Sequence, residues 1–209
     1  ELRSVVGAEF YERIVFLDRT RAQRPAVIAL PPPDRETTPD FDVVFAGGGL
    51  SLLIAVAVAS RGLRVAVCER TRAGVSHREW NASRNELEAL VHGGILVAED
   101  LKAMIVAKYQ HGTCRFFPGP AYPVANVLDH AVDAGALLAN VRSRAESLGV
   151  TFIDGAHVTG IGAGENAVRV SYAQHETSHE VVARVVVDAR GASSPYAVAD
   201  LVCPTVGGV

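Results

Sequence analysis

The sequence predicts an α/β fold built on a dinucleotide-binding βαβ unit, and three observations predict it. Residues 41–70 read as a buried strand, three glycines, an apolar helix and a second strand that ends in Glu69. Short β-type runs follow between residues 150 and 184, and an apolar strand over residues 185–194 carries Asp188. We expect this last strand to join the first two in one parallel sheet.

The glycine loop, Gly47, Gly48 and Gly49, lies where a βαβ unit approaches a pyrophosphate. Glycines let the backbone come close to phosphate oxygens, and the next helix supplies N–H groups and the positive end of its dipole. Glu69 follows at about 20 residues, the distance expected of an acid that binds ribose hydroxyls. The alternative is an ordinary βαβ unit with a glycine-rich turn and no nucleotide.

The usual third glycine of this pattern is missing. Counted from Gly47 it falls on Leu52, and counted from one residue earlier it falls on Ser51. This position packs the helix against the strand, so we expect Ser51 to allow close packing and Leu52 to resist it.

Composition excludes several classes of protein. The 209 residues are 49% hydrophobic, enough for a sizeable core, and the net charge of −3 leaves no electrostatic footprint for nucleic acid. Three scattered cysteines fit a reducing compartment better than a disulfide framework. The longest apolar run, residues 50–60, falls short of the roughly 20 residues that cross a membrane. We expect a cytoplasmic protein, with peripheral contact to a membrane surface as the alternative.

The sequence divides into three expected parts. Residues 1–24 have loose helical spacing, and residues 25–40 contain three consecutive prolines and predict a linker. Residues 41–209 form the nucleotide-binding domain. The chain has no initiating methionine and stops after an apolar strand, so we expect a truncated fold that lacks a substrate domain.

The middle of the chain predicts helices over residues 84–91, 98–108 and 134–148, with a proline-broken loop over residues 109–123. Ser83 and Glu86 have the spacing of a capping box, and Asp133 is the expected N-cap of the third helix. Gly149 is its expected stop.

The β-type runs at residues 150–153, 157–161, 167–172 and 180–184 predict an antiparallel meander. This meander separates the first βαβ unit from the strand that ends in Asp188 and Gly191. A nicotinamide dehydrogenase continues βαβαβ directly, whereas such an insertion is typical of the glutathione-reductase-type FAD fold. We therefore favour FAD over nicotinamide as the cofactor, with Asp188 as a simple turn acid as the alternative.

Two further motifs are open to two interpretations. His175 to His179 match HExxH, but zinc binding needs both histidines on one helix, and a hairpin turn is predicted there. No metal is expected. Arg78, Trp80 and Arg84 follow the ribose-binding strand and serve either a cofactor pocket or a loop with a core tryptophan.

Four stretches together resemble the CruA-type lycopene cyclases and their CruP-type relatives, which are flavoproteins of the glutathione-reductase-type fold. These stretches are GGGLSLL, the Glu69-Arg70 pair, HREWNASRNEL over residues 77–87 and VVVDARGASSP over residues 185–195. The resemblance extends over residues 41–209, and HREWNASRNEL is its most specific part.

The resemblance implies a FAD-dependent enzyme of carotenoid biosynthesis that closes the linear ends of lycopene into β-ionone rings. Reduced flavin acts without net redox change, and NAD(P)H is the expected reductant. The cofactor-binding residues expected from the resemblance and the motifs are Gly47, Gly48, Gly49, Ser51, Glu69, Arg70, Arg78, Asp188 and Gly191. We assign no catalytic residue, because the catalytic acid is expected beyond residue 209.

Two alternatives to the cyclase remain open. One is a redox flavoenzyme of the same fold, such as a FAD-dependent monooxygenase or a polyprenyl reductase. The other is a flavin-binding paralog without catalytic activity.

Overall fold

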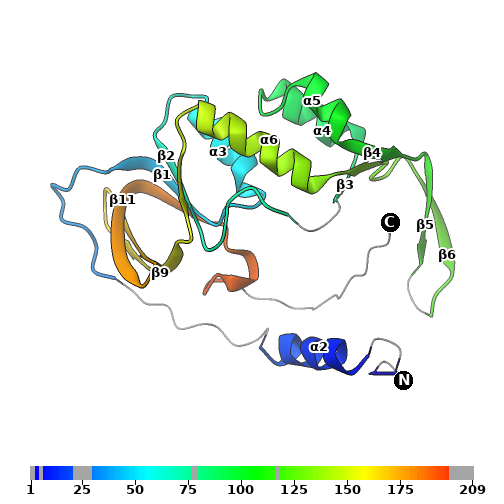
Figure 1. The fold of residues 1–209 in the computed structure, drawn as a ribbon, viewed down its shortest axis with the longest axis horizontal. Coiled ribbons are helices and arrows are strands. Elements are labelled where there is room, and N and C mark those ends of the chain that lie inside the picture. The colour runs from blue at the N-terminus through cyan, green and yellow to red at the C-terminus, as the bar shows by residue number, and fades with distance from the viewer. Residues whose placement is uncertain (1–2, 5–6, 21–29, 77–79, 116–117, 198–209) are drawn as a thin grey trace.

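The computed structural model of the chain describes residues 3–4, 7–20, 30–76, 80–115 and 118–197. A six-stranded sheet is the centre of the fold, in the order β8-β2-β1-β11-β10-β9 (Figure 1). Its strands are β1 (Phe41–Ala46), β2 (Val65–Glu69), β8 (Thr151–Asp154), β9 (His157–Ala163), β10 (Val168–Gln174) and β11 (Thr177–Asp188). The first four in the order are parallel to one another, whereas β10 pairs antiparallel with both of its neighbours, β11 and β9.

Two helices, α3 (Ser51–Ala59) and α6 (Ala134–Ser147), pack side by side on one face of this sheet (Figure 1). Their buried side chains, such as Leu52 and Leu138, join those of the central strands in the main core. The Asp133 carboxylate accepts a hydrogen bond from the Ala136 N–H, as expected of an N-cap.

The other face of the sheet is covered by the meander strands, because the sheet curves back on itself. Val44 and Ala66 of the central strands cluster with Val158 and Val170 of the meander. β9 lies at the far end of the strand order and still contacts β2, so the meander curls back over the parallel strands. This curl brings β9 to the carboxyl end of β2.

Two strand predictions are corrected. Residues 150–153 were expected in the meander, but β8 pairs in parallel with β2 because it returns from helix α6 as a crossover connection does. Residues 180–184 and 185–188 were expected as separate strands but belong to one strand, β11, because no turn residue separates them. Its first part pairs with β10 and its last part pairs in parallel with β1.

A smaller sheet in the order β3-β7-β4 lies beyond α6. It consists of β3 (Trp80–Ala82), β7 (His130–Val132) and β4 (Ile105–Lys108), and it packs with helices α4 (Arg84–His92) and α5 (Ala98–Met104). The capping box of α4 is confirmed, since the Glu86 N–H donates to Ser83 Oγ and the Ser83 N–H donates to the Glu86 carboxylate.

The expected extent of α5 and the expected loop after it are wrong. The helix ends at Met104 rather than near residue 108, because the β-branched residues Ile105 and Val106 enter strand β4 beside β7. Residues 109–123 contain most of a hairpin, β5 (His111–Arg115) and β6 (Ala121–Ala125), instead of an irregular loop.

Helix α2 (Ala8–Thr20) precedes the sheet. Residues 30–33 run along β9, where a Cβ built on Gly160 meets the Leu30 side chain at 2.8 Å. The division of the chain at residues 24 and 40 remains a prediction. No helix among the described residues combines the length and apolar character needed to cross a membrane.

Candidate functional site

Gly47 turns the chain at the end of β1 in a conformation that other residues rarely adopt. Its φ is +112°, and its N–H donates to the Cys68 carbonyl at 2.8 Å. A Cβ at this position would lie 2.5 Å from the Ala189 carbonyl oxygen. The site therefore needs glycine here for backbone conformation and for close approach to the chain after β11.

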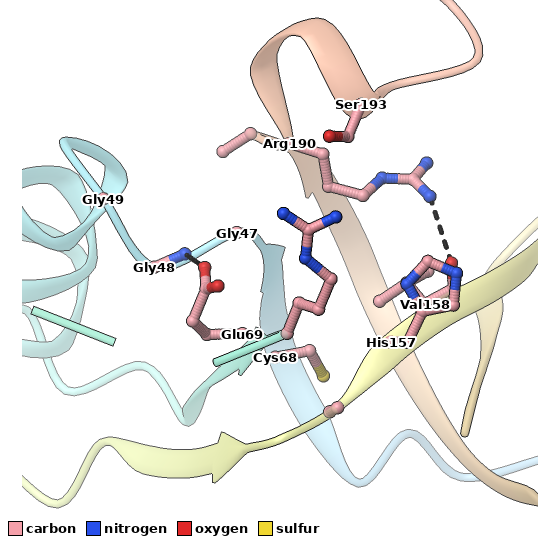
Figure 2. Close-up of a pocket in the computed structure, with 12 residues that line it drawn as sticks. Gly47, Gly48, Gly49, Cys68, Glu69, His157, Val158, Arg190 and Ser193 are labelled. Atoms are coloured by element: carbon pink, nitrogen blue, oxygen red, sulfur yellow. Dashed lines mark hydrogen bonds between the residues drawn. The ribbon is translucent and has the colours of Figure 1, made fainter. Parts of the chain in front are cut away.

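Gly48 connects the glycine loop to the acid at the end of β2. Its N–H donates to Glu69 Oε2 at 2.8 Å, and Figure 2 shows the two residues facing each other. The other carboxylate oxygen accepts from the Thr71 N–H at 3.1 Å and from Thr71 Oγ1 at 3.3 Å. A Cβ on Gly48 would lie 2.5 Å from the Ala73 Cβ, so this position also requires glycine. The loop thus fixes the orientation of the Glu69 carboxylate.

Gly49 is exposed and leads into helix α3. A Cβ built on Gly49 meets no described atom within 4 Å, so its open side is available to a ligand. Leu50 is the N-cap residue and makes no side-chain hydrogen bond to the helix. The Leu52 and Leu53 N–H groups donate to the Gly49 and Leu50 carbonyls, so the start of α3 would attract an anion mainly through the positive end of its dipole.

Ser51 and Leu52 are both buried on the sheet side of α3. Ser51 Oγ donates to the Gly47 carbonyl at 2.5 Å, and the Leu52 side chain is fully enclosed in the main core. The expectation that Leu52 resists packing is therefore wrong, because its side chain finds space between α3 and the core. The Ser51 hydroxyl therefore stabilises the glycine loop through the Gly47 carbonyl, on the buried side of α3.

Arg190 follows β11 and lies across from the glycine loop (Figure 2). The Asp188 carboxylate binds its guanidinium at two points, Nε to Oδ1 at 2.9 Å and Nη2 to Oδ2 at 2.8 Å. Arg190 Nη1 also donates to the Val158 carbonyl at 3.3 Å, which Figure 2 shows as a bridge to β9. Ser194 Oγ donates to Asp188 at 2.6 Å. Asp188 thus holds Arg190 in one orientation.

Burial raises the pKa of the Asp188 carboxyl, but the hydrogen bonds from Arg190 and Ser194 outweigh it and bring the pKa to about 2. A carboxyl with a lowered pKa stabilises the fold above its unfolded pKa of about 4 and loses this contribution as the pH falls towards 2. We expect Asp188→Asn to lower the free energy of unfolding by roughly 1–2 kcal/mol at pH 7, allowing for solvent screening. Urea unfolding at several pH values measures this, and a deficit that stays constant down to pH 2 would contradict it.

The glycine loop, Glu69 and Arg190 line one cleft, here called the glycine cleft, at the carboxyl ends of β1, β2 and β11. β1 stands between the other two, and doubly wound sheets bind ligands at such a switch point. The enclosed volume is about 120 Å³. Pockets for drug-sized ligands hold roughly 300–1,000 Å³, so the cleft would enclose one part of a dinucleotide. Its walls are Gly47, Gly48, Gly49, Cys68, Glu69, Arg70, Ala156, His157, Val158, Ala189, Arg190 and Ser193.

The structure brings together five of the predicted residues as lining of this cleft: Gly47, Gly48, Gly49, Glu69 and Arg70. Three others, Ser51, Asp188 and Gly191, lie next to lining residues but are not part of the lining.

The segment with the only tryptophan takes a different place. Arg78 lies outside the described residues. Trp80 packs against the main core, and Arg84 pairs with Glu88 at 2.6 Å on the surface of α4. Neither residue lines the glycine cleft. Of the two interpretations of this segment, the one in which its tryptophan packs in the core therefore fits Trp80.

Sequence reasoning missed Arg190, Ser193 and the β9 residues. Arg190 had a signal, because it is the basic residue inside the Asp188-to-Gly191 turn that was itself singled out. His157 and Val158 had none, since only the curl of the meander brings β9 to the cleft.

The HExxH match lies in the turn between β10 and β11. His175 and Glu176 both have positive φ, 48° and 65°, as in a two-residue hairpin turn, and His179 stacks on Tyr172 within the strands. The helix that zinc binding requires is replaced by the predicted turn. The described part of the chain holds no group of three or more His, Cys, Asp or Glu side chains suited to a metal ion.

No protein-family model matches the chain, and no curated protein matches its sequence. Solved structures do match its fold. AlpK matches with a TM-score of 0.61 at 19% identity, and the match covers 76% of this chain and 33% of AlpK. A second match is CndH, the myxobacterial chondrochloren halogenase, which is FAD-dependent. Its TM-score is 0.60 at 21% identity, and the match covers 72% of this chain and 37% of CndH.

A third match is CabE, an aromatic hydroxylase from angucycline biosynthesis, with a TM-score of 0.57 at 21% identity. The match covers 73% of this chain and 31% of CabE. The chain thus has the FAD-binding-type fold of such enzymes and spans about a third of their length.

Proposed function

We propose that this chain is the FAD-binding part of a flavin-dependent oxidoreductase of the hydroxylase and halogenase class. The observation that carries the proposal is the Gly48–Glu69 hydrogen bond at the carboxyl ends of β1 and β2. This bond supports the proposal, because it joins an acid to the glycine loop at the edge of the sheet that βαβ units use to bind the ADP half of a dinucleotide.

The residues present fit that half of FAD. A carboxylate has about four lone-pair positions, and three donors from Gly48 and Thr71 already bind Glu69. One position remains for a ribose hydroxyl. Glu69 would therefore bind the ribose in the orientation that the glycine loop imposes.

Arg190 and the start of α3 would bind the pyrophosphate. A guanidinium has five N–H donors, and Asp188 and Val158 accept from three of them. Two donors remain for phosphate oxygens, and the N-terminus of α3 adds its dipole from the other side. Arg70 adds a second positive charge to the cleft. When bound, FAD supplies two-electron transfer from a reduced nicotinamide nucleotide to oxygen and substrate.

A second candidate is the lycopene cyclase that the sequence resemblance implies. It is favoured by HREWNASRNEL, although Trp80 and Arg84 of this stretch do not line the glycine cleft. The structural matches, which include an aromatic hydroxylase and a FAD-dependent halogenase, support the oxidoreductase instead.

The two candidates differ in what they consume. The whole protein with bound flavin should oxidise NADH or NADPH and take up oxygen at a rate that rises with an aromatic substrate. The same gene, expressed in cells that accumulate lycopene, should leave the pigment unchanged. Conversion of lycopene to a monocyclic or bicyclic carotene without net NAD(P)H consumption would overturn the oxidoreductase proposal in favour of the cyclase.

A further inference from the structure

A second recess, the α4–β7 groove, shares no lining residue with the glycine cleft. Its volume is about 760 Å³, within the range of small-molecule sites. Apolar side chains from α4, α5 and β4 form part of its lining, namely Leu87, Leu101 and Ile105. Polar and charged side chains form the rest. The three apolar side chains offer a contact surface to the body of a small ligand, and the eight polar or charged residues offer it hydrogen-bond partners.

His130 is the unusual residue of this groove. It lies on the central strand of the small sheet, two residues before Val132, and both side chains are buried on the same face. Val132 belongs to the main core, so the next position on that face would be expected to be apolar. Instead, Nδ1 of His130 lies 2.7 Å from Asp129 Oδ1.

Asp129 orients this histidine. Its carboxylate also accepts from the Arg84 N–H at 3.0 Å, which ties it to the start of α4. The hydrogen bond with His130 is the main cause that lowers the pKa of Asp129, so the carboxyl is ionised at neutral pH. An ionised carboxylate accepts the proton of Nδ1, which leaves the lone pair of a neutral ring on Nε2.

Nε2 of His130 opens onto the groove. It makes no hydrogen bond to any described residue, whereas Nδ1 is bound to Asp129. His130 is one of the residues that line the groove, so Nε2 is its ring nitrogen available to a ligand there.

Two carboxylates line the groove near His130, but Asp129 is paired with His130 itself and Glu88 is paired with Arg84. Lys108 of β4 is the cross-strand neighbour of His130 and makes no ion pair within the described residues. The other cation, Arg84, already binds Glu88 at 2.6 Å. Side chains of cross-strand neighbours project from the same face of a sheet, so the Lys108 ammonium is the available counter-charge.

We propose that the α4–β7 groove binds a weakly acidic hydroxyl compound with a small apolar body that contacts Leu87, Leu101 and Ile105, of which a phenol is the simplest example. The hydroxyl proton passes to Nε2 of His130. The products are an imidazolium that is paired with Asp129 and a phenolate beside Lys108, so charge and protons balance. This site does not depend on the flavin proposal, because its binding can be measured without flavin.

The probe is p-nitrophenol, whose visible absorbance reports its ionised form. Titrating the flavin-free chain into the probe, at a pH where free p-nitrophenol is half ionised, should give a saturable rise in the phenolate band. His130→Gln, which keeps a polar side chain of similar size, should weaken binding roughly tenfold or more and remove the rise. Lys108→Met should reduce the rise, and p-nitroanisole, which has no proton to donate, should compete poorly.

His92→Ala is the matched control, because His92 is an exposed histidine at the end of the same helix α4 and does not line the groove. Circular dichroism establishes that each variant is folded, and Lys108→Met tests the proposal even if His130→Gln unfolds. No saturable change with the parent chain, or an equal change with His130→Gln or with Lys108→Met, would overturn it.

Discussion

Replacing Gly47 with alanine is expected to lower the free energy of unfolding by about 2–4 kcal/mol. The new Cβ would lie 2.5 Å from the Ala189 carbonyl oxygen and 2.7 Å from its carbon, and backbone atoms cannot move aside as a flexible side chain can. The positive φ of +112° adds strain for any residue with a Cβ. Urea unfolding followed by circular dichroism measures the change.

Gly49→Ala is the control within the same loop. Its Cβ would meet nothing described within 4 Å, and its φ is not among the positive ones, so stability should change by about 0.5 kcal/mol or less. If both variants were equally stable, the close approach of the glycine loop to the chain after β11 would be wrong.

Arg142→Ala is expected to lower the free energy of unfolding by about 2–3 kcal/mol. Arg142 on α6 is 13% exposed and binds Asp154 at 2.9 Å, the Ala73 carbonyl at 2.9 Å and the face of Phe152 at 4.3 Å. Asp154 in turn accepts from the Ala73 N–H at 2.8 Å. Removing the guanidinium leaves the partly buried Asp154 carboxylate with the Ala73 N–H but without its counter-charge, and it removes the donor of the Ala73 carbonyl.

The same change should also weaken ligand binding, because the Arg142 contacts hold the segment that follows Glu69. Arg72→Ala is the matched control: it removes an exposed arginine from that segment, with an expected change within about 0.5 kcal/mol. Thermal and urea unfolding of both variants decide this. An Arg142→Ala protein as stable as the Arg72→Ala protein would show that the Arg142–Asp154 pair does not support the fold.

The features predicted correctly from the sequence depend on residues close together in the chain. The capping box at Ser83 needs only Glu86, and the turn at His175 needs only its neighbours. The βαβ unit is also local, since its glycines, helix and acid lie within residues 41–70. Short-range rules of capping, turn chemistry and periodicity are enough for such elements.

The features that were missed depend on contacts between distant segments. β8 was assigned to the meander because its sequence does not show that it returns beside β2. Ile105 ends α5 because β7, more than twenty residues later, offers it a strand partner. The cleft has the same origin: Arg190 faces it because Asp188 holds the guanidinium and Val158 of β9 accepts from it.

Competition binding to the purified chain tests the central claim, that the glycine cleft binds the ADP half of FAD. FAD is titrated with and without ADP or FMN, and binding is followed by flavin fluorescence. ADP should displace FAD and FMN should not, because FMN lacks the part that Glu69 binds.

Glu69→Ala should weaken FAD binding by about 1–3 kcal/mol, whereas Glu165→Ala, which removes an exposed glutamate paired with Arg35, should leave it unchanged. Displacement of FAD by FMN as effective as displacement by ADP, or a Glu69→Ala chain that binds FAD as the parent does, would contradict the account.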